Sequence, residues 1–446
     1  MKRKALRRWA GAPLIFLAIG GMFSAAGMLY GMTPPSAEEL GVSAPVYVLA
    51  DTQQFDLRIA PPEEFSQARL QSATITVQFL TAGQTDVQGQ PCLTWPAGAQ
   101  TAFNYAVSIW ATQINSTVPI VIQACWADLG SNSILGYGGS YSVRDFPNAP
   151  RTSTWYAMAL ANALSGADRN GTSPEIFTTY NQNFTWYYGT DGNTPAGQVD
   201  FVSVVLHEIA HGLGFSGSMR VSSGQGSWGG GTGYPYSYDC YAEDGVGSSL
   251  LNTSVYPNPS AALGSALTSG TIWFDGPYAN AANDGRRVKL YAPGTWAQGS
   301  SYSHLDYATY AGTINALMVY AISAGTSIHN PGPVTMGLLY DVGWALTGDE
   351  STPTPPATPT DTPTATPTPT HTPTSTPSPT PSRTATPLPY PSVSPTPPSA
   401  YNHYIYLPLV LNHTHSSTIA ALEPTMPVWQ IVLTPLIAAL SQELQP

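Results

Sequence analysis

Charged side chains are scarce in this sequence. Asp, Glu, Lys and Arg together make up 9% of the 446 residues, and the formal net charge is -11. No basic patch follows the first eight residues, which excludes a typical nucleic-acid-binding surface. The hydroxyl and amide side chains that replace charge are typical of an exported protein.

Cysteine is also scarce, with only Cys92, Cys125 and Cys240. Three cysteines are too few for a disulfide scaffold. Their spacing allows a Cys92–Cys125 bridge that leaves Cys240 free, but the sequence alone does not fix the pairing.

The two ends of the chain differ from its middle. Residues 1–32 start with a basic cluster and continue as an apolar run, which predicts a signal peptide or, because of its length, an N-terminal membrane anchor. Residues 33–71 are expected to be a connector or short pro-segment. Residues 350–399 form a Ser/Thr/Pro-rich linker that cannot bury a core, so we expect a disordered stalk. Residues 400–446 form an apolar tail, a candidate for envelope or membrane attachment.

Residues 72–349 have the pattern of a folded α+β domain. Strands and helices alternate before residue 200, which predicts a twisted sheet backed by helices, followed by an irregular C-terminal subdomain. The β-rich runs are 73–80, 118–126, 134–141 and 175–180, and the runs with helical spacing are 99–115, 155–164 and 333–344.

One apolar stretch contains the pattern H-E-x-x-H. His207 and His211 are four residues apart, so on a helix they lie one turn apart on one face and can bind a single metal ion. Glu208 is placed to accept a proton from a metal-bound water. Asp200 is a suitable helix N-cap and Gly212 a suitable helix end, and this context favours a zinc site over a pair of ordinary core histidines.

A catalytic zinc site needs a third protein ligand and an open position. In the compact pattern H-E-x-x-H-x-x-G-x-x-H the third histidine lies six residues after the second, and this chain has Gly217 there. The third ligand must therefore come from another segment. The candidates are His304, His329, Asp239, Glu243 and Asp244.

The sequence resembles the metzincin clan of zinc endopeptidases, and more narrowly the leishmanolysin-type enzymes. In that family a long insertion precedes the third histidine, and a methionine follows it in a tight turn beneath the metal. The second half lacks the dense cysteines of eukaryotic members, which suggests a bacterial surface relative. Three clusters carry the resemblance: His207-Glu208 with His211, Gly214-Phe215, and His304 followed by Leu317-Met318.

The resemblance implies a role for each matching residue. Glu208 would be the general base and Met318 the turn methionine. His329 follows Met318, which is the wrong chain order for a ligand. Tyr320 is a further candidate for contact with zinc or the oxyanion, although packing explains a tyrosine there as well. The implied zinc ligands are His207, His211 and His304.

Two further points concern metals and latency. Asp168 with Asn170, and Asp191 with Asn193, occupy glycine-containing loops that could bind calcium, but ordinary turn chemistry explains them and calcium stays unsupported. No cysteine lies within 33–71, so this segment cannot supply a cysteine switch.

The expected function is a secreted or cell-surface zinc metalloendopeptidase that hydrolyses protein or peptide substrates through a zinc-activated water. Two alternatives remain: a non-catalytic envelope adhesin on a zincin scaffold, and a zinc hydrolase acting on cell-wall peptide. Retention of Glu208 disfavours the adhesin, because a scaffold that only binds metal needs no base there.

Overall fold

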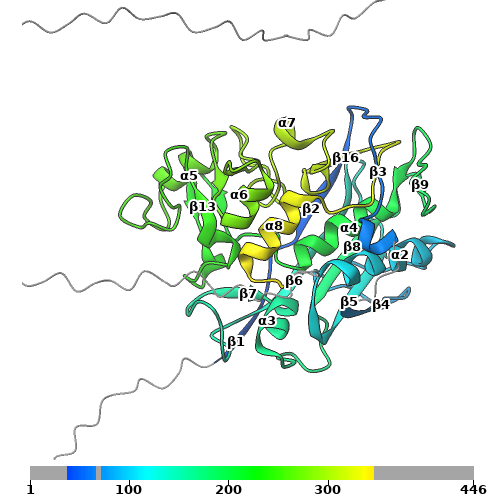
Figure 1. Ribbon diagram of the computed structural model, residues 1–446, viewed down its shortest axis with the longest axis horizontal. Helices are drawn as coiled ribbons and strands as arrows, with labels where there is room; N and C mark the ends of the chain where they lie inside the picture. Colours follow the sequence, from blue (N-terminus) through cyan, green and yellow to red (C-terminus); the bar gives the residue numbers. More distant parts are fainter. Residues whose placement is uncertain (1–37, 67–71, 346–446) are drawn as a thin grey trace, which may run out of the picture. The chain divides into compact units, whose positions relative to one another are not determined.

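The computed structural model describes residues 38–66 and 72–345, which form a mixed α and β architecture as expected. Its centre is an eight-stranded sheet with the order β16-β2-β6-β8-β5-β4, in which β1 and β7 also pair with β6 (Figure 1). The strands of this sheet are β1 (Glu39–Val42), β2 (Val46–Asp51), β4 (Ala73–Phe79), β5 (Ser116–Ala127), β6 (Ile134–Arg144), β7 (Trp155–Ala157), β8 (Ile176–Asn181) and β16 (Ala321–Ser323).

The sheet is mixed in direction. Strands β4, β5 and β8 are parallel, and β6 runs antiparallel to β8. Strand β2 is antiparallel to β6 and parallel to β16. Every residue of β8 is buried, as expected for a central strand covered on both faces.

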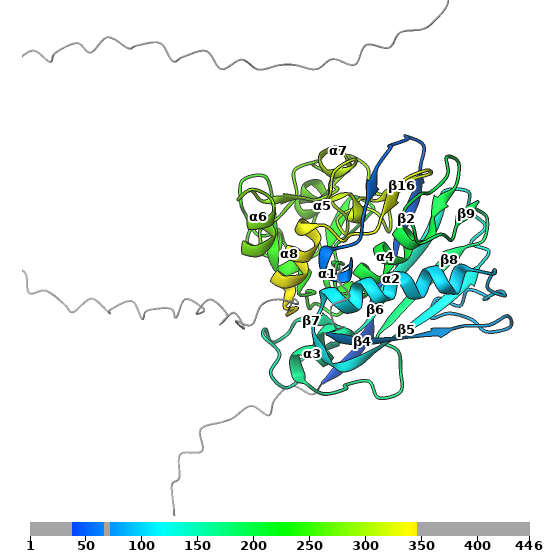
Figure 2. The same cartoon turned by 45° about the vertical axis from the view of Figure 1, so that its right-hand side comes forward.

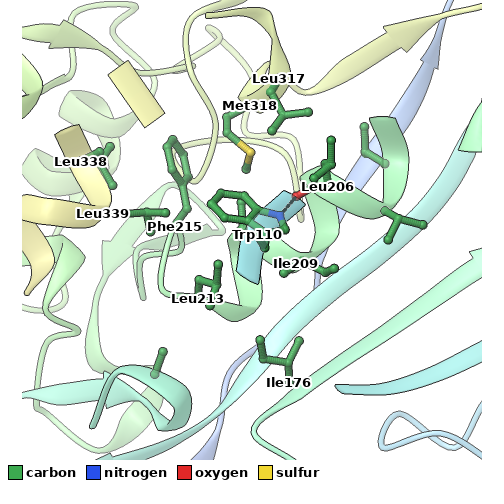
Figure 3. Packing of buried hydrophobic residues seen from close by; sticks show 14 of the residues in the cluster. Trp110, Ile176, Leu206, Ile209, Leu213, Phe215, Leu317, Met318, Leu338 and Leu339 are labelled. Carbon is green, nitrogen blue, oxygen red and sulfur yellow. Dashed lines mark hydrogen bonds between the residues drawn. The ribbon is translucent and has the colours of Figure 1, made fainter. Parts of the chain in front are cut away.

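Two long helices, α2 (Ala99–Gln113) and α4 (Phe201–Gly212), pack against each other and on the sheet (Figure 2). Phe103, Val107 and Trp110 of α2 are buried at helical spacing. The Trp110 indole N–H donates to the Leu206 carbonyl at 3.1 Å and so joins the two helices (Figure 3). The helix that carries the H-E-x-x-H motif is therefore fixed within the core.

The chain after α4 is largely irregular, and most of it, including α5, α6 and α8, lies to one side of the sheet in green and yellow in Figure 1, while β16 joins the sheet. The remaining helices are α1 (Glu63–Ser66), α3 (Met158–Ser165), α5 (Ala261–Leu267), α6 (Pro277–Ala282), α7 (Tyr307–Tyr310) and α8 (Pro333–Val342), with 3-10 turns η1 (Gly229–Gly231), η2 (Tyr238–Tyr241) and η3 (Ala316–Met318). The short strands are β3 (Arg58–Ile59), β9 (Trp186–Tyr187), β10 (Val199–Asp200), β11 (Arg220–Ser222), β12 (Gln225–Ser227), β13 (Ala242–Glu243), β14 (Trp273–Phe274), β15 (Val288–Lys289) and β17 (Ser327–Ile328).

Most predicted elements of the domain are confirmed within a few residues, with one correction. The segment 155–164 was expected to be a single helix, but its first three residues form β7 and only the rest forms α3. Trp155, Tyr156 and Ala157 pair with Arg144, Val143 and Ser142 of β6. This pairing across the sheet outweighs the local helical pattern.

The N-terminal segment is more structured than a connector. Within the predicted 33–71 region the structure contains β1, β2, β3 and α1, and β2 lies inside the main sheet. The predictions for 1–32, 350–399 and 400–446 concern residues outside the described ones. Within the described ranges, no helix is both long and apolar enough to cross a membrane.

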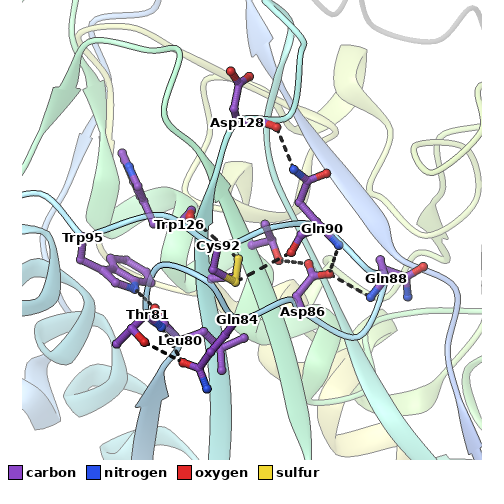
Figure 4. The surroundings of a disulfide bond; sticks show 12 residues. Leu80, Thr81, Gln84, Asp86, Gln88, Gln90, Cys92, Trp95, Trp126 and Asp128 are labelled. Atoms are coloured by element: carbon purple, nitrogen blue, oxygen red, sulfur yellow. Dashed lines mark hydrogen bonds between the residues drawn. A yellow bond between two sulfur atoms is a disulfide. The ribbon is translucent and has the colours of Figure 1, made fainter.

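The disulfide joins Cys92 to Cys125, as the spacing allowed, and Cys240 is free (Figure 4). Cys125 lies in β5, so the bond ties the loop after β4 to the sheet. In the same loop, Asp86 accepts hydrogen bonds from the Tyr137 hydroxyl at 2.5 Å and the Thr179 hydroxyl at 2.6 Å. Covalent and polar contacts together hold this loop against β6 and β8.

Glycines in β6 let helix α4 approach the sheet closely. A Cβ atom at Gly138 would stand 2.5 Å from the Glu208 carbonyl oxygen and 3.0 Å from Glu208 Oε2. A Cβ at Gly136 would stand 3.6 Å from Glu208 Oε1. The β6 strand therefore carries Gly138 where the helix backbone passes.

We expect Gly138→Ala to destabilise the fold by about 1–3 kcal/mol, because the new methyl group meets helix backbone rather than a flexible side chain. Denaturant unfolding of the full chain measures the change. Gly294→Ala is the matched control, since a Cβ there has no atom within 4 Å, and should change stability by no more than about 0.5 kcal/mol. Equal stability of the two variants would contradict close packing of α4 on β6.

Candidate metal centre

Helix α4 has well-defined ends. The Asp200 side chain accepts a hydrogen bond from the Ser203 backbone N–H at 2.8 Å, so it is the predicted N-cap. The helix ends at Gly212, and Gly214 has a φ of 114°, a value that L side chains rarely adopt. Every residue from Phe201 to Gly212 is buried, which explains the apolar run of the sequence.

The structure brings His304 to the two histidines of α4. His207 Nε2 lies 3.0 Å from His211 Nε2 and 3.2 Å from His304 Nε2. Two ligands of a tetrahedral zinc ion, each about 2.0–2.1 Å from the metal, stand roughly 3.3 Å apart. All three imidazoles have no exposed surface. Within the described residues, this is the one cluster of three or more His, Cys, Asp or Glu residues with metal-binding geometry.

Backbone carbonyls fix which nitrogen of each ring carries the proton. Nδ1 lies 2.6 Å from the Leu317 oxygen in His207, 2.7 Å from the Phe215 oxygen in His211, and 2.6 Å from the Ser300 oxygen in His304. A carbonyl only accepts, so each Nδ1 must donate and each neutral ring has a lone pair on Nε2. Three converging lone pairs cannot bond to one another. They form a donor set that fits a cation.

Burial keeps the three rings in the form that binds metal. It lowers the pKa of His207 to about 4. It also lowers the pKa values of His211 and His304 well below the ordinary value, and the neighbouring histidines add to the shift. The imidazoles are therefore neutral near pH 7 without needing a partner to remove their protons.

Glu208 is the unusual carboxylate of the site. It is fully buried, and neither carboxylate oxygen has a hydrogen-bond partner. Burial raises its pKa well above the ordinary value, and a weak interaction with the Val48 backbone N–H, too poor in geometry to count as a hydrogen bond, partly opposes that shift. Buried polar groups in native structures are nearly always paired, so an unpaired carboxylate next to a histidine of the triad points to a chemical role.

Met318 lies in the turn that also orients the first histidine. Turn η3 ends at Met318, and the Leu317 carbonyl before it accepts from His207. Met318 is fully buried, and its sulfur points toward Phe215 and Trp110 (Figure 3). The Met318 carbonyl accepts from Leu305 N at 2.8 Å, which joins this turn to the segment carrying His304.

The other candidate ligands lie elsewhere. His329 Nε2 is 2.9 Å from Asp200 Oδ2, at the opposite end of α4 from His211. Asp239 accepts from Ser218, Tyr236 and Tyr302. Glu243 pairs with Arg287, and Asp244 accepts from Tyr256. These groups therefore support the fold, and His304 is the histidine that completes the triad.

The structure also explains why the compact pattern fails at Gly217. A Cβ atom there would stand 2.1 Å from the Tyr302 ring and 2.5 Å from Asp239 Oδ1. The space that a third histidine would need at this position is filled by the pair formed by Tyr302 and Asp239.

Tyr320 lies among aromatic neighbours. Its ring stacks on Tyr291 at 4.2 Å and packs against Tyr307 at 5.3 Å between centroids. Within 38–66 and 72–345, no hydrogen bond or ring contact joins it to the triad. The catalytic role suggested for Tyr320 stays a prediction, and packing accounts for its position.

The two loops that could have bound calcium use their carboxylates in turns, as ordinary turn chemistry predicted. Asp168 Oδ1 accepts from the backbone N–H groups of Asn170 and Gly171. Asp191 Oδ1 accepts from Asn193 N at 3.0 Å and from the Tyr187 hydroxyl at 2.6 Å. The contacts with backbone N–H groups are those of Asx turns, and together with the tyrosine contact they account for both loops.

Sequence reasoning missed two groups that surround Glu208. One is the glycine pair of β6, Gly136 and Gly138. The glycines that interrupt this predicted strand were the sequence feature that could have revealed it. The other is Tyr180 of β8, which is fully buried, has an unpartnered hydroxyl, and has its pKa raised chiefly by burial and also by Glu208. No sequence signal marks Tyr180, because its nearness to Glu208 depends on how α4 crosses the sheet.

Comparisons with known proteins add one partial match. A family model described as SPBPB7E8-like matches residues 163–223, a span that includes all of α4 and its H-E-x-x-H motif. Neither the curated proteins nor the solved structures contain a match to the chain.

We expect His304→Ala to lose stoichiometric zinc binding, because two imidazoles do not complete the three-ligand set. His329→Ala should keep the zinc, since His329 contacts Asp200 instead. Zinc content of the purified full-length variants, measured by elemental analysis after dialysis, checks both. Zinc loss in both variants or in neither would contradict the assignment of His304.

Proposed function

We propose that this protein is a zinc-dependent endopeptidase of the metzincin clan, related to leishmanolysin-type enzymes, that acts in the extracellular space or at the cell surface. The observation that carries the proposal is the pairing of two features. Three neutral imidazoles converge through Nε2, and beside His207 lies a buried carboxylate, Glu208, with no hydrogen-bond partner. A structural role for Glu208 would have supplied partners for its oxygens.

The three histidines would hold the metal through Nε2, and the Leu317, Phe215 and Ser300 carbonyls would keep each ring oriented. Neutral nitrogen ligands of this kind suit zinc. When bound, zinc supplies Lewis acidity at the scissile carbonyl and lowers the pKa of a water toward about 7.

Glu208 would act as the general base. It would take a proton from the attacking water and later return it to the leaving amine. The raised pKa gives the carboxylate a higher proton affinity, which favours proton uptake from the water. The turn that ends at Met318 would hold the Leu317 carbonyl against His207, and Met318 itself would not contact the substrate.

The two alternatives are less well supported. A non-catalytic adhesin gives no reason for an unpaired buried carboxylate next to the first histidine. A hydrolase for cell-wall peptide would use the same residues, and no observed contact favours that substrate over a polypeptide. We therefore propose protein or peptide substrates.

We expect Glu208→Gln to keep zinc and lower peptide hydrolysis by about 10²–10⁴-fold, because general-base catalysis contributes that much. Casein and a quenched fluorescent peptide mixture are the substrates. Because the triad is buried, each protein is assayed both as purified and after limited proteolysis. Glu243→Gln, which alters a pair with Arg287 instead, should keep full activity. Hydrolysis that survives Glu208→Gln, or that persists in chelator, would contradict the proposal.

A further inference from the structure

A cavity with a volume of about 500 Å³ lies at the start of α4, apart from the histidine triad. Its walls come from four parts of the chain: residues 58–65 with β3 and α1, helix α2, the loop 190–193, and the residue that follows β17. Asp200, which the last of these residues contacts, is roughly 10 Å along the helix axis from His207. A cavity of this size is typical of small-molecule sites.

Polar contacts join the walls of this cavity to one another. The Arg58 guanidinium donates to the carbonyls of Gly192 at 2.8 Å and Thr194 at 3.1 Å, which ties β3 to the loop. The Ile59 carbonyl accepts from the His329 N–H at 2.9 Å, which ties β3 to the segment after β17. Helix α2 packs on both α1 and α4 (Figure 2). The shape of the cavity is therefore fixed by the fold.

His329 is the buried polar side chain of this wall, with 1% of its surface exposed. Its Nε2 lies 2.9 Å from Asp200 Oδ2, and the Asp200 carboxylate also accepts from Ser203 and Thr194. Because this carboxylate accepts, Nε2 donates, and the neutral ring has its lone pair on Nδ1. Within 38–66 and 72–345, Nδ1 has no hydrogen-bond partner, yet it is not fully enclosed by protein. The cavity therefore offers a ligand an unpaired acceptor held in place by a buried carboxylate.

The mouth of the cavity is acidic. Asp191 is exposed there, and hydrogen bonds from Tyr187 and Asn193 lower its pKa to about 2, so it is ionised at neutral pH. Among the residues that the structure describes, no ion pair neutralises it. Arg58, the one Lys or Arg of the lining, donates to two carbonyls and stands 3.8 Å from Asp56. The charges around the cavity therefore favour a cation.

The remaining wall is apolar and aromatic. Ile59, Pro61 and Phe65 line it beside Tyr105 of α2. The Phe65 and Tyr105 rings meet edge to face at 5.3 Å between centroids, and Tyr105 meets the His329 ring in the same manner at 5.8 Å. Apolar surface with a few polar groups beside it suits a ligand that has an apolar body and a polar head.

We propose that this cavity binds a small organic ammonium compound, in which one ammonium N–H donates to His329 Nδ1 and an aromatic or aliphatic body packs against Phe65 and Tyr105. An ammonium group has three donors and no acceptor, so it matches an unpaired ring nitrogen and the ionised Asp191 in the same lining. A carboxylate ligand would meet Asp191 as a like charge. The site is separate from the histidine triad, so this inference does not depend on the proposed peptidase function.

Phenethylamine is the test probe, with 2-phenylethanol and phenylacetate as its neutral and anionic counterparts. Binding to the full chain is measured by isothermal titration calorimetry at pH 8, where a primary amine is still charged, with chelator present so that no probe binds a metal. Phenethylamine should bind at least about tenfold more tightly than either counterpart, since a hydrogen bond to a charged group contributes that much. Equal binding of the three probes, tighter binding of phenylacetate, or no binding would overturn the proposal.

Variants locate the bound amine. Ala60→Phe fills the exposed rim of the cavity without removing a polar group, and should weaken phenethylamine binding at least about tenfold. Asp191→Asn should weaken it about two- to fivefold, the effect of an exposed ion pair. Asp284→Asn, which alters an exposed pair with Arg286 outside the cavity, is the matched control and should change nothing. His304→Ala should also keep the affinity. Unchanged binding in Ala60→Phe, or loss of binding in His304→Ala, would overturn the proposed site.

His329→Leu tests the acceptor itself. Without Nδ1 the affinity for phenethylamine should fall at least about tenfold, and the affinity for 2-phenylethanol should fall less, because the stronger charge-assisted contact is the one removed. Circular dichroism checks that the variant is folded, and Ala60→Phe, which leaves His329 and its contact with Asp200 in place, tests the site independently of that outcome. An equal loss of affinity for both probes in folded His329→Leu would contradict recognition of the ammonium by His329.

Discussion

Three backbone carbonyls determine what the buried histidines can do. Each accepts the Nδ1 proton of one ring, and the three Nε2 lone pairs are left to converge. The Nε2 atoms lie 3.0 to 3.2 Å apart, and lone pairs at that distance repel one another, so the three rings form a donor set that a cation would stabilise. The carbonyls come from Phe215, just after α4, and from Leu317 and Ser300, about a hundred residues further along. The site therefore exists only when the irregular second half of the domain is folded against α4.

The sheet supplies the other side of the site. Helix α4 reaches β6 closely because Gly138 has no side chain, and the Glu208 carboxylate lies against Gly138 and Gly136. The same β6 residues pair with β2 on the neighbouring position of the sheet. Strand β6 thus lies against the Glu208 carboxylate on one face and pairs with β2 along its edge. The surroundings of Glu208 therefore depend on the segment that pairs with β6.

Burial has opposite effects on the two kinds of group in the site. It lowers the pKa values of the three histidines, which keeps them neutral and able to bind metal. It raises the pKa of Glu208, because burial disfavours the charged carboxylate. The apolar sequence around the motif, which by itself indicates only a core helix, therefore also shifts the pKa values of these four groups.

The sequence by itself determined the local half of this site. The four-residue spacing of His207 and His211, the N-cap Asp200 and the helix end at Gly212 all depend on the geometry of a single helix, and the structure agrees with each. The alternation of strands and helices before residue 200 also predicted the sheet, because each of those elements is indicated by the pattern of its own residues. The disulfide was one of the pairings that the spacing allowed.

Only the tertiary structure decided the rest. Spacing could not choose between His304 and His329, because each lies about a hundred residues from α4; the family resemblance favoured His304, and the geometry places it in the triad while His329 lies at Asp200. Likewise, nothing in the local sequence placed β2 beside β6, or Tyr180 near Glu208. These contacts join segments far apart in the chain, and their positions depend on how the whole core packs rather than on any local pattern.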